Sequence, residues 1–281
     1  MDKPISVAYS PDTDDAFMVH AMKEGHIDTG DYQFEFISDD IQCLNQKALD
    51  ETYDITAISI AVYPDIADKY FMMPVGASIG DKFGPALVTQ NESDISCIED
   101  LENKKIAVPG IKTSAFYAAN MLLPNFEAVP MRFDLIESAI KTGKVAAGIL
   151  IHELQLNYED VGLKKVADLG ALWNERYQLP LPLGANAIKK SLGTSAINEL
   201  NQIYKTSIEW ALSSRVDTIK IASQLAKAGL DDSLADKYIS MYVNHRSLSF
   251  DDDVLEAIDL MYKFAAKKGF CPDISGKNIL I

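Results

Sequence analysis

Short apolar segments alternate with helical segments along the first third of the chain, and this alternation limits the fold more than any other feature of the sequence. We expect strands over residues 5–9, 32–36 and 54–59, and helices over residues 16–23, 41–48 and 59–70, the last interrupted near Pro64. The short apolar segments have the length and pattern of buried strands. Strands that alternate with helices are typical of an α/β fold with a mostly parallel sheet.

The same alternation returns after a glycine-rich segment, residues 71–84, and a strand at 85–90. The second run has strands at 105–108, 128–133 and 146–151, with helices starting at Thr113 and Asp134. The chain crosses back at 181–187, and the remaining segments 196–212, 216–229, 231–243 and 251–268 are helical in pattern. We therefore expect two lobes joined by two crossings. The larger comprises 1–88 and 182–281, the smaller 89–181, with a ligand cleft between them.

Composition disfavours several classes of partner. The 281 residues carry 41 acidic and 26 basic side chains, a formal net charge of −15, which argues against a nucleic-acid partner. No apolar run approaches the roughly 18 residues of a membrane span, and the acidic N-terminal segment is unlike a signal peptide. We expect a cytoplasmic protein without a membrane partner. The late helices offer surfaces through which subunits could pair as a homo-oligomer, but no motif marks them.

The strand at 146–151 leads directly into His152 and Glu153. The carboxyl ends of strands in open α/β sheets are where ligands bind. A zinc motif HExxH is excluded because Leu156 stands where the second histidine would be. Cys43, Cys97 and Cys271 match no metal spacing either, so we expect reduced thiols and no metal site. A core histidine and a catalytic base are both open interpretations of His152, and its strand-end position favours the base.

Residues 109–115 lie between a strand and a helix. Thr113 and Ser114 would offer hydroxyls and free backbone N–H groups to a carboxylate or oxyanion at the helix start, and an ordinary N-cap is the alternative. Ser10 and Ser59 each end a strand of one predicted sheet and could present hydroxyls to the same cleft. No GxGxxG or Walker loop is present, so nucleotide phosphates are not indicated.

Several motifs recur in order along nearly the whole chain. The most specific are Gly148 to Glu153, and Asp168-Leu169-Gly170 followed by Leu181-Pro182-Leu183-Gly184. The others are Ser10-Pro11 with Asp15 and Phe17, Asp40-Ile41 with Leu44-Asn45, Ser59, Gly84-Pro85, and Val108-Pro109-Gly110 with Thr113. With these motifs the chain resembles the 1,4-dihydroxy-6-naphthoate synthases of the futalosine route to menaquinone.

The resemblance implies a two-lobed, type II periplasmic-binding-protein-like fold used as a carbon–carbon lyase without metal or organic cofactor. The implied substrate is a small-molecule carboxylate, cyclic dehypoxanthine futalosine, and the implied product is 1,4-dihydroxy-6-naphthoate. His152 matches the family's catalytic proton acceptor. The resemblance implies substrate contacts at Ala57, Ile58, Ser59, Thr113, Ser114 and Ala115, and we also expect Ser10 and Asn45 to bind the substrate.

Two positions depart from the family pattern. After Ser10-Pro11, family members commonly have Cys-Pro-Asn-Asp-Thr, where this chain has Asp12 to Ala16. A lysine is common in the family where Ala57 stands. An added carboxylate and a lost cation would change how an acidic substrate is held if these residues face the cleft. A chorismate dehydratase-like enzyme of the same pathway, or a non-catalytic small-molecule binding protein of the same fold, therefore remain alternatives.

Overall fold

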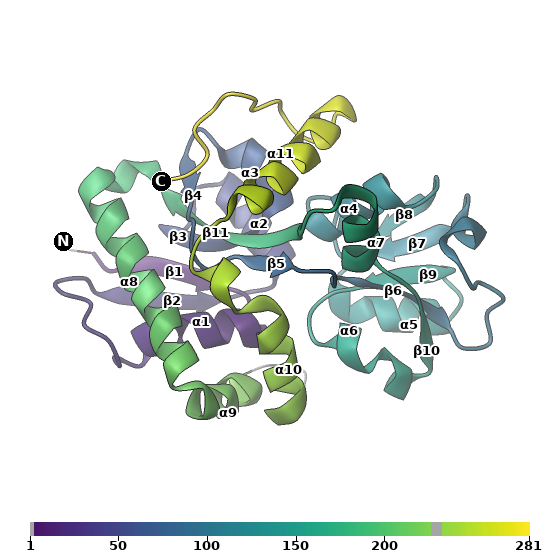
Figure 1. Ribbon diagram of the computed structural model, residues 1–281, viewed down its shortest axis with the longest axis horizontal. Helices are drawn as coiled ribbons and strands as arrows, with labels where there is room; N and C mark the ends of the chain where they lie inside the picture. Colours follow the sequence, from purple (N-terminus) through teal and green to yellow (C-terminus); the bar gives the residue numbers. More distant parts are fainter. Residues whose placement is uncertain (1–2, 226–231) are drawn as a thin grey trace.

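A computed structural model describes residues 3–225 and 232–281. Its strands form two sheets, one in each of two lobes (Figure 1). The first sheet contains β1 (Ile5–Tyr9), β2 (Phe34–Ser38), β3 (Ile55–Ser59), β4 (Tyr70–Met72), β5 (Ser78–Gly80) and β11 (Leu181–Lys189). The second contains β6 (Ala86–Gln90), β7 (Lys105–Val108), β8 (Glu127–Pro130), β9 (Ala147–Leu150) and β10 (Leu163–Asp168). The predicted α/β, two-lobed class is confirmed.

Both sheets are mixed, so the predicted mostly parallel sheet is wrong. In the first sheet, of order β2-β1-β3-β11-β4, only β1 pairs in parallel, with β2 and β3. In the second, of order β10-β6-β9-β7-β8, only β7 pairs in parallel, with β8 and β9. The antiparallel pairs involve β6 and β11, which follow the two crossings. Two strands joined by a crossover helix in one sheet run parallel. A strand that enters the sheet from the other lobe has no such connection, so it can pair antiparallel.

The helices cover both lobes. The first lobe carries α1 (Thr13–Lys23), α2 (Ile41–Leu49), α3 (Tyr63–Ile66), α8 (Thr194–Ser213), α9 (Arg215–Leu225), α10 (Asp232–Tyr242) and α11 (Asp252–Lys267). The second carries α4 (Ser114–Leu122), α5 (Ile136–Lys141), α6 (Leu154–Asn157) and α7 (Leu169–Tyr177). Helix α1 packs on α8, α9 and α10, and α11 reaches α4 of the second lobe (Figure 1). None of the helices in the described ranges is long and apolar enough to cross a membrane.

Three local expectations need correction. The expected helix over 59–70 is a 3₁₀ turn at Ile60–Val62 followed by the short α3, and Tyr70 already belongs to β4. The glycine-rich segment 71–84 contains β5 as well as the end of β4. Pro64 lies in the first turn of α3, where proline is tolerated, so it starts that helix rather than interrupting one. The residues after Leu225 in the expected helix 216–229, and residue 231 of the next, lie outside the described residues.

The crossing is tightly packed around two glycines. A Cβ atom on Gly170, at the start of α7, would overlap the carbonyl group of Phe83. A Cβ on Gly84 would lie 2.8 Å from the backbone nitrogen of Gly170. The backbone at Phe83 and Gly84 is in direct contact with the backbone at Gly170. Only glycine, which lacks a Cβ atom, permits so close an approach. The division of the lobes at 88/89 stays a prediction, and that division falls within β6.

Candidate active site

A cavity lies between the two lobes, at the carboxyl ends of parallel strands from both sheets. Its cavity volume is about 110 Å³. Strands β1 and β3 bring Ser10 and Ser59 to this edge from the first lobe, because parallel strands end on the same side. Strands β7 and β9 bring the turn before α4 and His152 from the second lobe in the same way.

Most of the predicted site residues line this cavity. They are Ser10, Ala57, Ile58, Ser59, Thr113, Ser114, Ala115 and His152. Asn45 is not among the lining residues. It lies behind Ser59, where its Nδ2 donates to the Ser59 hydroxyl at 3.0 Å and its Oδ1 accepts from the Ser59 backbone N–H at 2.8 Å. Asn45 therefore sets the orientation of Ser59 from the interior of the first lobe.

His152 is held in an unusual conformation directly after β9. Its φ is +61°, in the left-handed backbone region that few residues other than glycine adopt. Nδ1 lies 2.7 Å from the Asp12 carboxylate, and the Phe133 ring packs edge-on against the imidazole with centroids 4.6 Å apart. Nε2 is buried and has no hydrogen-bond partner among the described residues. One ring nitrogen is thus occupied and the other is free beside the cavity.

Glu153 reaches across the cleft to the start of α1. Its carboxylate accepts from the backbone N–H of Thr13 at 2.8 Å and also from the Thr13 hydroxyl. Free N–H groups at a helix start carry partial positive charge, so a carboxylate is stabilised there. The side chain of Glu153 therefore caps a helix of the opposite lobe.

Three carboxyl groups of the first turn of α1 line the cavity: Asp12, Asp14 and Asp15. Burial and then the Asp12 carboxylate raise the pKa of Asp14 to about 7, although Ser78 donates to it at 2.8 Å. Burial and then Asp14 raise the pKa of Asp15 well above its ordinary range. None of the described lining residues is Lys or Arg. Of the positions that depart from the family pattern, Asp12, Asp14 and Ala57 therefore line the cleft.

The hydroxyls before α4 are used inside the protein. Thr113 caps the helix, since its Oγ1 accepts from the Phe116 N–H and donates to the Gly110 carbonyl. The Ser114 hydroxyl donates to the Leu183 carbonyl at 2.6 Å and accepts from the Ala61 N–H at 3.1 Å, which ties the crossing together. The backbone N–H groups of Ser114 and Ala115 have no partner among the described residues. What this turn offers a ligand is its N–H groups.

Sequence reasoning missed Ser78, Gln155, Tyr238 and Tyr242, which also line the cavity. The two tyrosines lie on α10, and Tyr242 donates to Gln155 at 3.1 Å. Their helical spacing is that of an ordinary apolar face, so no signal in the sequence distinguishes them from core residues. His20 and His26 lie beside Trp210, away from the cavity, and His245 is exposed, as their structural interpretation implies.

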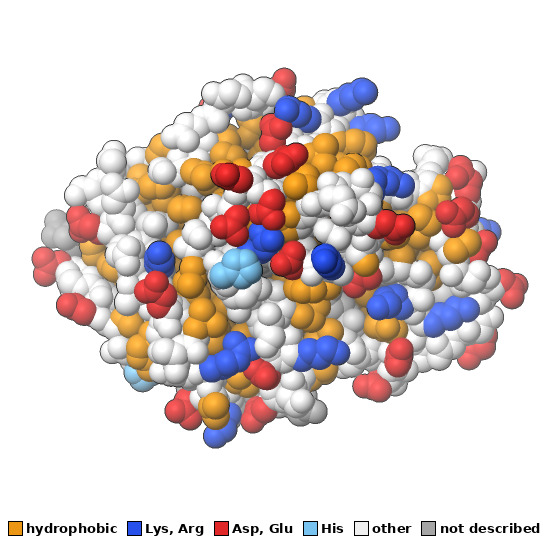
Figure 2. Space-filling view, in the orientation of Figure 1, with side chains coloured by type: hydrophobic (Ala, Val, Ile, Leu, Met, Phe, Trp, Pro, Cys, Tyr) orange, Lys and Arg blue, Asp and Glu red, His pale blue; other side chains and the backbone are white. Residues whose placement is uncertain are grey.

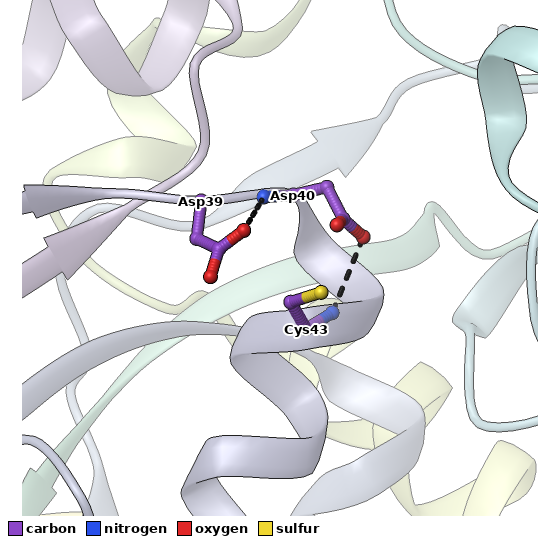
Figure 3. Close-up of side chains that lie close together, drawn as sticks. All are labelled: Asp39, Asp40 and Cys43. Atoms are coloured by element: carbon purple, nitrogen blue, oxygen red, sulfur yellow. Dashed lines mark hydrogen bonds between the residues drawn. The ribbon is translucent and has the colours of Figure 1, made fainter.

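In the part of the chain that the structure describes, one group of side chains has the spacing of metal ligands: Asp39, Asp40 and Cys43 (Figure 3). All three already have partners. Asp39 pairs with Lys47 at 2.8 Å, and Asp40 caps α2 by accepting from the N–H groups of Gln42 and Cys43. The Asp40 carboxylate raises the pKa of the Cys43 thiol to about 11, which keeps it protonated. Capping explains this cluster.

A sequence model described as menaquinone biosynthesis matches residues 5–267. This chain belongs to the menaquinone biosynthesis family. The 1,4-dihydroxy-6-naphthoate synthase of Thermus thermophilus is 30% identical over 265 residues, 94% of this chain and 95% of that protein. The enzyme of the same name from Streptomyces coelicolor is 31% identical over 274 residues, 95% of each chain.

Solved structures agree with the fold. A crystal structure of a protein from Archaeoglobus fulgidus has a TM-score of 0.88 at 40% identity, covering 95% of this chain and 98% of that one. The alkanesulfonate-binding protein of Xanthomonas axonopodis has a TM-score of 0.74 at 13% identity, covering 99% and 96% of the two chains. The second likeness shows a periplasmic-binding-protein fold alone. The face shown in Figure 2 intersperses acidic and basic side chains, without a continuous basic patch on that face.

Proposed function

We propose that this chain is a carbon–carbon lyase that converts cyclic dehypoxanthine futalosine to 1,4-dihydroxy-6-naphthoate, with His152 as its general base. The observation that carries the proposal is that His152 lines the cleft cavity and that its buried Nε2 has no hydrogen-bond partner among the described residues, in a chain of this family. An acceptor nitrogen without a partner is costly to bury unless a ligand completes it. A substrate C–H or O–H group would do so.

The reaction needs one proton acceptor and one site for negative charge. Nε2 of His152 takes a proton from the bound substrate, and the released electron pair enters the ring as it becomes aromatic. The carbon–carbon bond to the sugar-derived fragment then breaks, and that fragment leaves with the bonding pair and gains a proton. No oxidant is consumed. The N–H groups of Ser114 and Ala115 would hold the substrate carboxylate or the developing oxyanion, since donors fixed in advance stabilise charge best.

The charge of the cavity bears on the alternatives. Chorismate carries two carboxylates, and a cavity lined by Asp12, Asp14 and Asp15 without Lys or Arg is poorly suited to a dianion. A single carboxylate can be held by the free N–H groups at the start of α4.

The direct test is to incubate purified protein with cyclic dehypoxanthine futalosine and to follow the naphthoate product by its absorbance and mass. Chorismate in a parallel reaction tests the sister activity. We expect turnover of the first compound only. Folded protein that leaves it unchanged would overturn the proposed reaction, and turnover of chorismate would support the dehydratase instead.

The pH dependence of kcat/KM tests the role of His152 separately. Burial lowers the pKa of His152, but the Asp12 carboxylate outweighs it and the pKa rises to about 9. A base acts only when deprotonated, so its active fraction grows about tenfold per pH unit below its pKa. We expect kcat/KM to rise with pH and to level off above about pH 9. Rates at substrate concentrations well below KM give this profile. A profile that falls over the same range would mean that His152 works in its protonated form.

A further inference from the structure

Asp12 and His152 come from different lobes and meet across the cleft. Asp12 precedes α1 in the first lobe, and His152 follows β9 in the second. The Asp12 carboxylate lies 2.7 Å from Nδ1 of His152, and neither side chain is more than 10% exposed. A contact this short and this buried fixes both partners much more firmly than an ion pair at the surface.

The carboxylate of Asp12 is not needed for its usual local task. Asp12 stands at the N-cap position of α1 with an extended backbone, φ −77° and ψ 157°, yet its side chain makes no capping hydrogen bond. Glu153 of the other lobe binds the Thr13 N–H in its place. Asp12 instead turns toward His152, and the Ser10 hydroxyl donates to the same Asp12 oxygen, Oδ2. Asp12 and Glu153 thus each bind a residue of the opposite lobe: Asp12 binds His152, and Glu153 binds Thr13.

We propose that Asp12 is a positioning residue for this site: it accepts the Nδ1–H of His152 across the cleft and so leaves Nε2 as the proton acceptor when the imidazole is neutral. The inference rests on the proposed role of His152 as the base. A carboxylate on Nδ1 selects the tautomer whose other nitrogen is bare and holds the ring in place. Because the two residues belong to different lobes, this contact depends on the packing of the lobes against each other.

The surroundings of His152 leave this role to Asp12. Phe133 packs against the ring but offers it no hydrogen-bond partner. Asp14, Asp15 and Glu153 are the other ionisable groups near it. Asp14 accepts from Ser78, Asp15 from the Ser10 N–H, and Glu153 from Thr13. Asp12 is thus the carboxylate whose contact with the imidazole is direct.

The first test needs no substrate. Nitrogen and carbon chemical shifts of His152 in isotope-labelled protein report its tautomer and its pKa, in the wild type and in Asp12→Asn, Asp12→Ala and Asp31→Asn. Asp31 is an exposed acid in the loop before β2 and serves as the matched control. In the wild type and in the control we expect a His152 pKa of about 9 and, at pH values above it, the Nδ1–H tautomer. The pKa should fall in both Asp12 variants, and the tautomer should become mixed in Asp12→Ala.

An unchanged His152 pKa and tautomer in Asp12→Ala would overturn the proposal. This readout holds whichever compound the protein turns over, so it fails or succeeds independently of the proposed reaction. Circular dichroism of each variant confirms that the fold is intact before the shifts are compared.

The second test is kinetic. We expect Asp12→Ala to lower kcat by at least about tenfold with a smaller change in KM, because a positioning residue acts on the base rather than on substrate binding. The same change made in a His152→Asn background should have almost no further effect, since the residue that Asp12 positions is already gone. An equal loss in both backgrounds would mean that Asp12 acts by another route. Asp12→Cys places the family's common residue there and should resemble Asp12→Ala in its His152 tautomer.

Discussion

Replacing His152 by asparagine is expected to lower kcat by roughly 10²- to 10⁴-fold, the usual contribution of a general base. Asparagine is the informative substitution because the backbone at this position has a φ of +61°, which asparagine tolerates better than most residues. It therefore removes the imidazole without forcing the turn after β9 to rearrange. Steady-state rates of naphthoate formation measure the loss, and His152→Ala gives a second value that includes the backbone effect.

A control keeps this result interpretable. His245 is exposed and does not line the cavity, so His245→Asn should retain the wild-type rate. The thermal midpoint of His152→Asn is expected to fall, because the buried Asp12 carboxylate loses its partner, so rates are compared at a temperature well below that midpoint. A His152→Asn protein that keeps its rate to within about threefold would exclude this residue as the base, since losing one costs far more.

Truncating Trp173 to alanine is expected to lower the free energy of unfolding by roughly 3–5 kcal/mol. Trp173, on α7, is fully buried in an apolar cluster that also contains Leu181 of β11 and Met261 of α11. Its indole nitrogen has no hydrogen-bond partner among the described residues, so the loss is one of packing. Urea unfolding followed by circular dichroism measures the change, because the midpoint falls while the slope stays constant.

Two further variants serve as controls for the Trp173→Ala measurement. Trp173→Phe keeps most of the buried ring and should lose much less than the alanine variant. Val216→Ala, at a side chain that is 69% exposed, should change the free energy of unfolding by less than about 0.5 kcal/mol. A loss below about 1 kcal/mol in Trp173→Ala would show that this cluster does not join the second lobe to α11 as its contacts indicate.

Local pattern predicted the elements well and their pairing poorly. The strand at 5–9 and the helices after residue 189 follow directly from runs and spacing of apolar side chains, which encode burial and local conformation. The strand β10 and helix α7 were not assigned, although Asp168 caps α7 and a capping residue can be read from sequence. Pairing depends on segments far apart in the chain: Ala187 of β11 lies beside Thr56 of β3 and Met72 of β4. No local pattern reports such a partner.

The sequence by itself determined that His152 follows a buried strand, and the motifs around it predicted the family that the comparisons confirm. Both are properties of contiguous residues. Only the tertiary structure decided what His152 faces. Its partner Asp12 belongs to the other lobe. The neighbouring contact of Thr13 with Glu153 joins residues that are 140 positions apart in the chain. Folding brings these carboxylates together by stacking the carboxyl edges of two sheets, a geometry that depends on the packing of both lobes and has no signature in either segment alone.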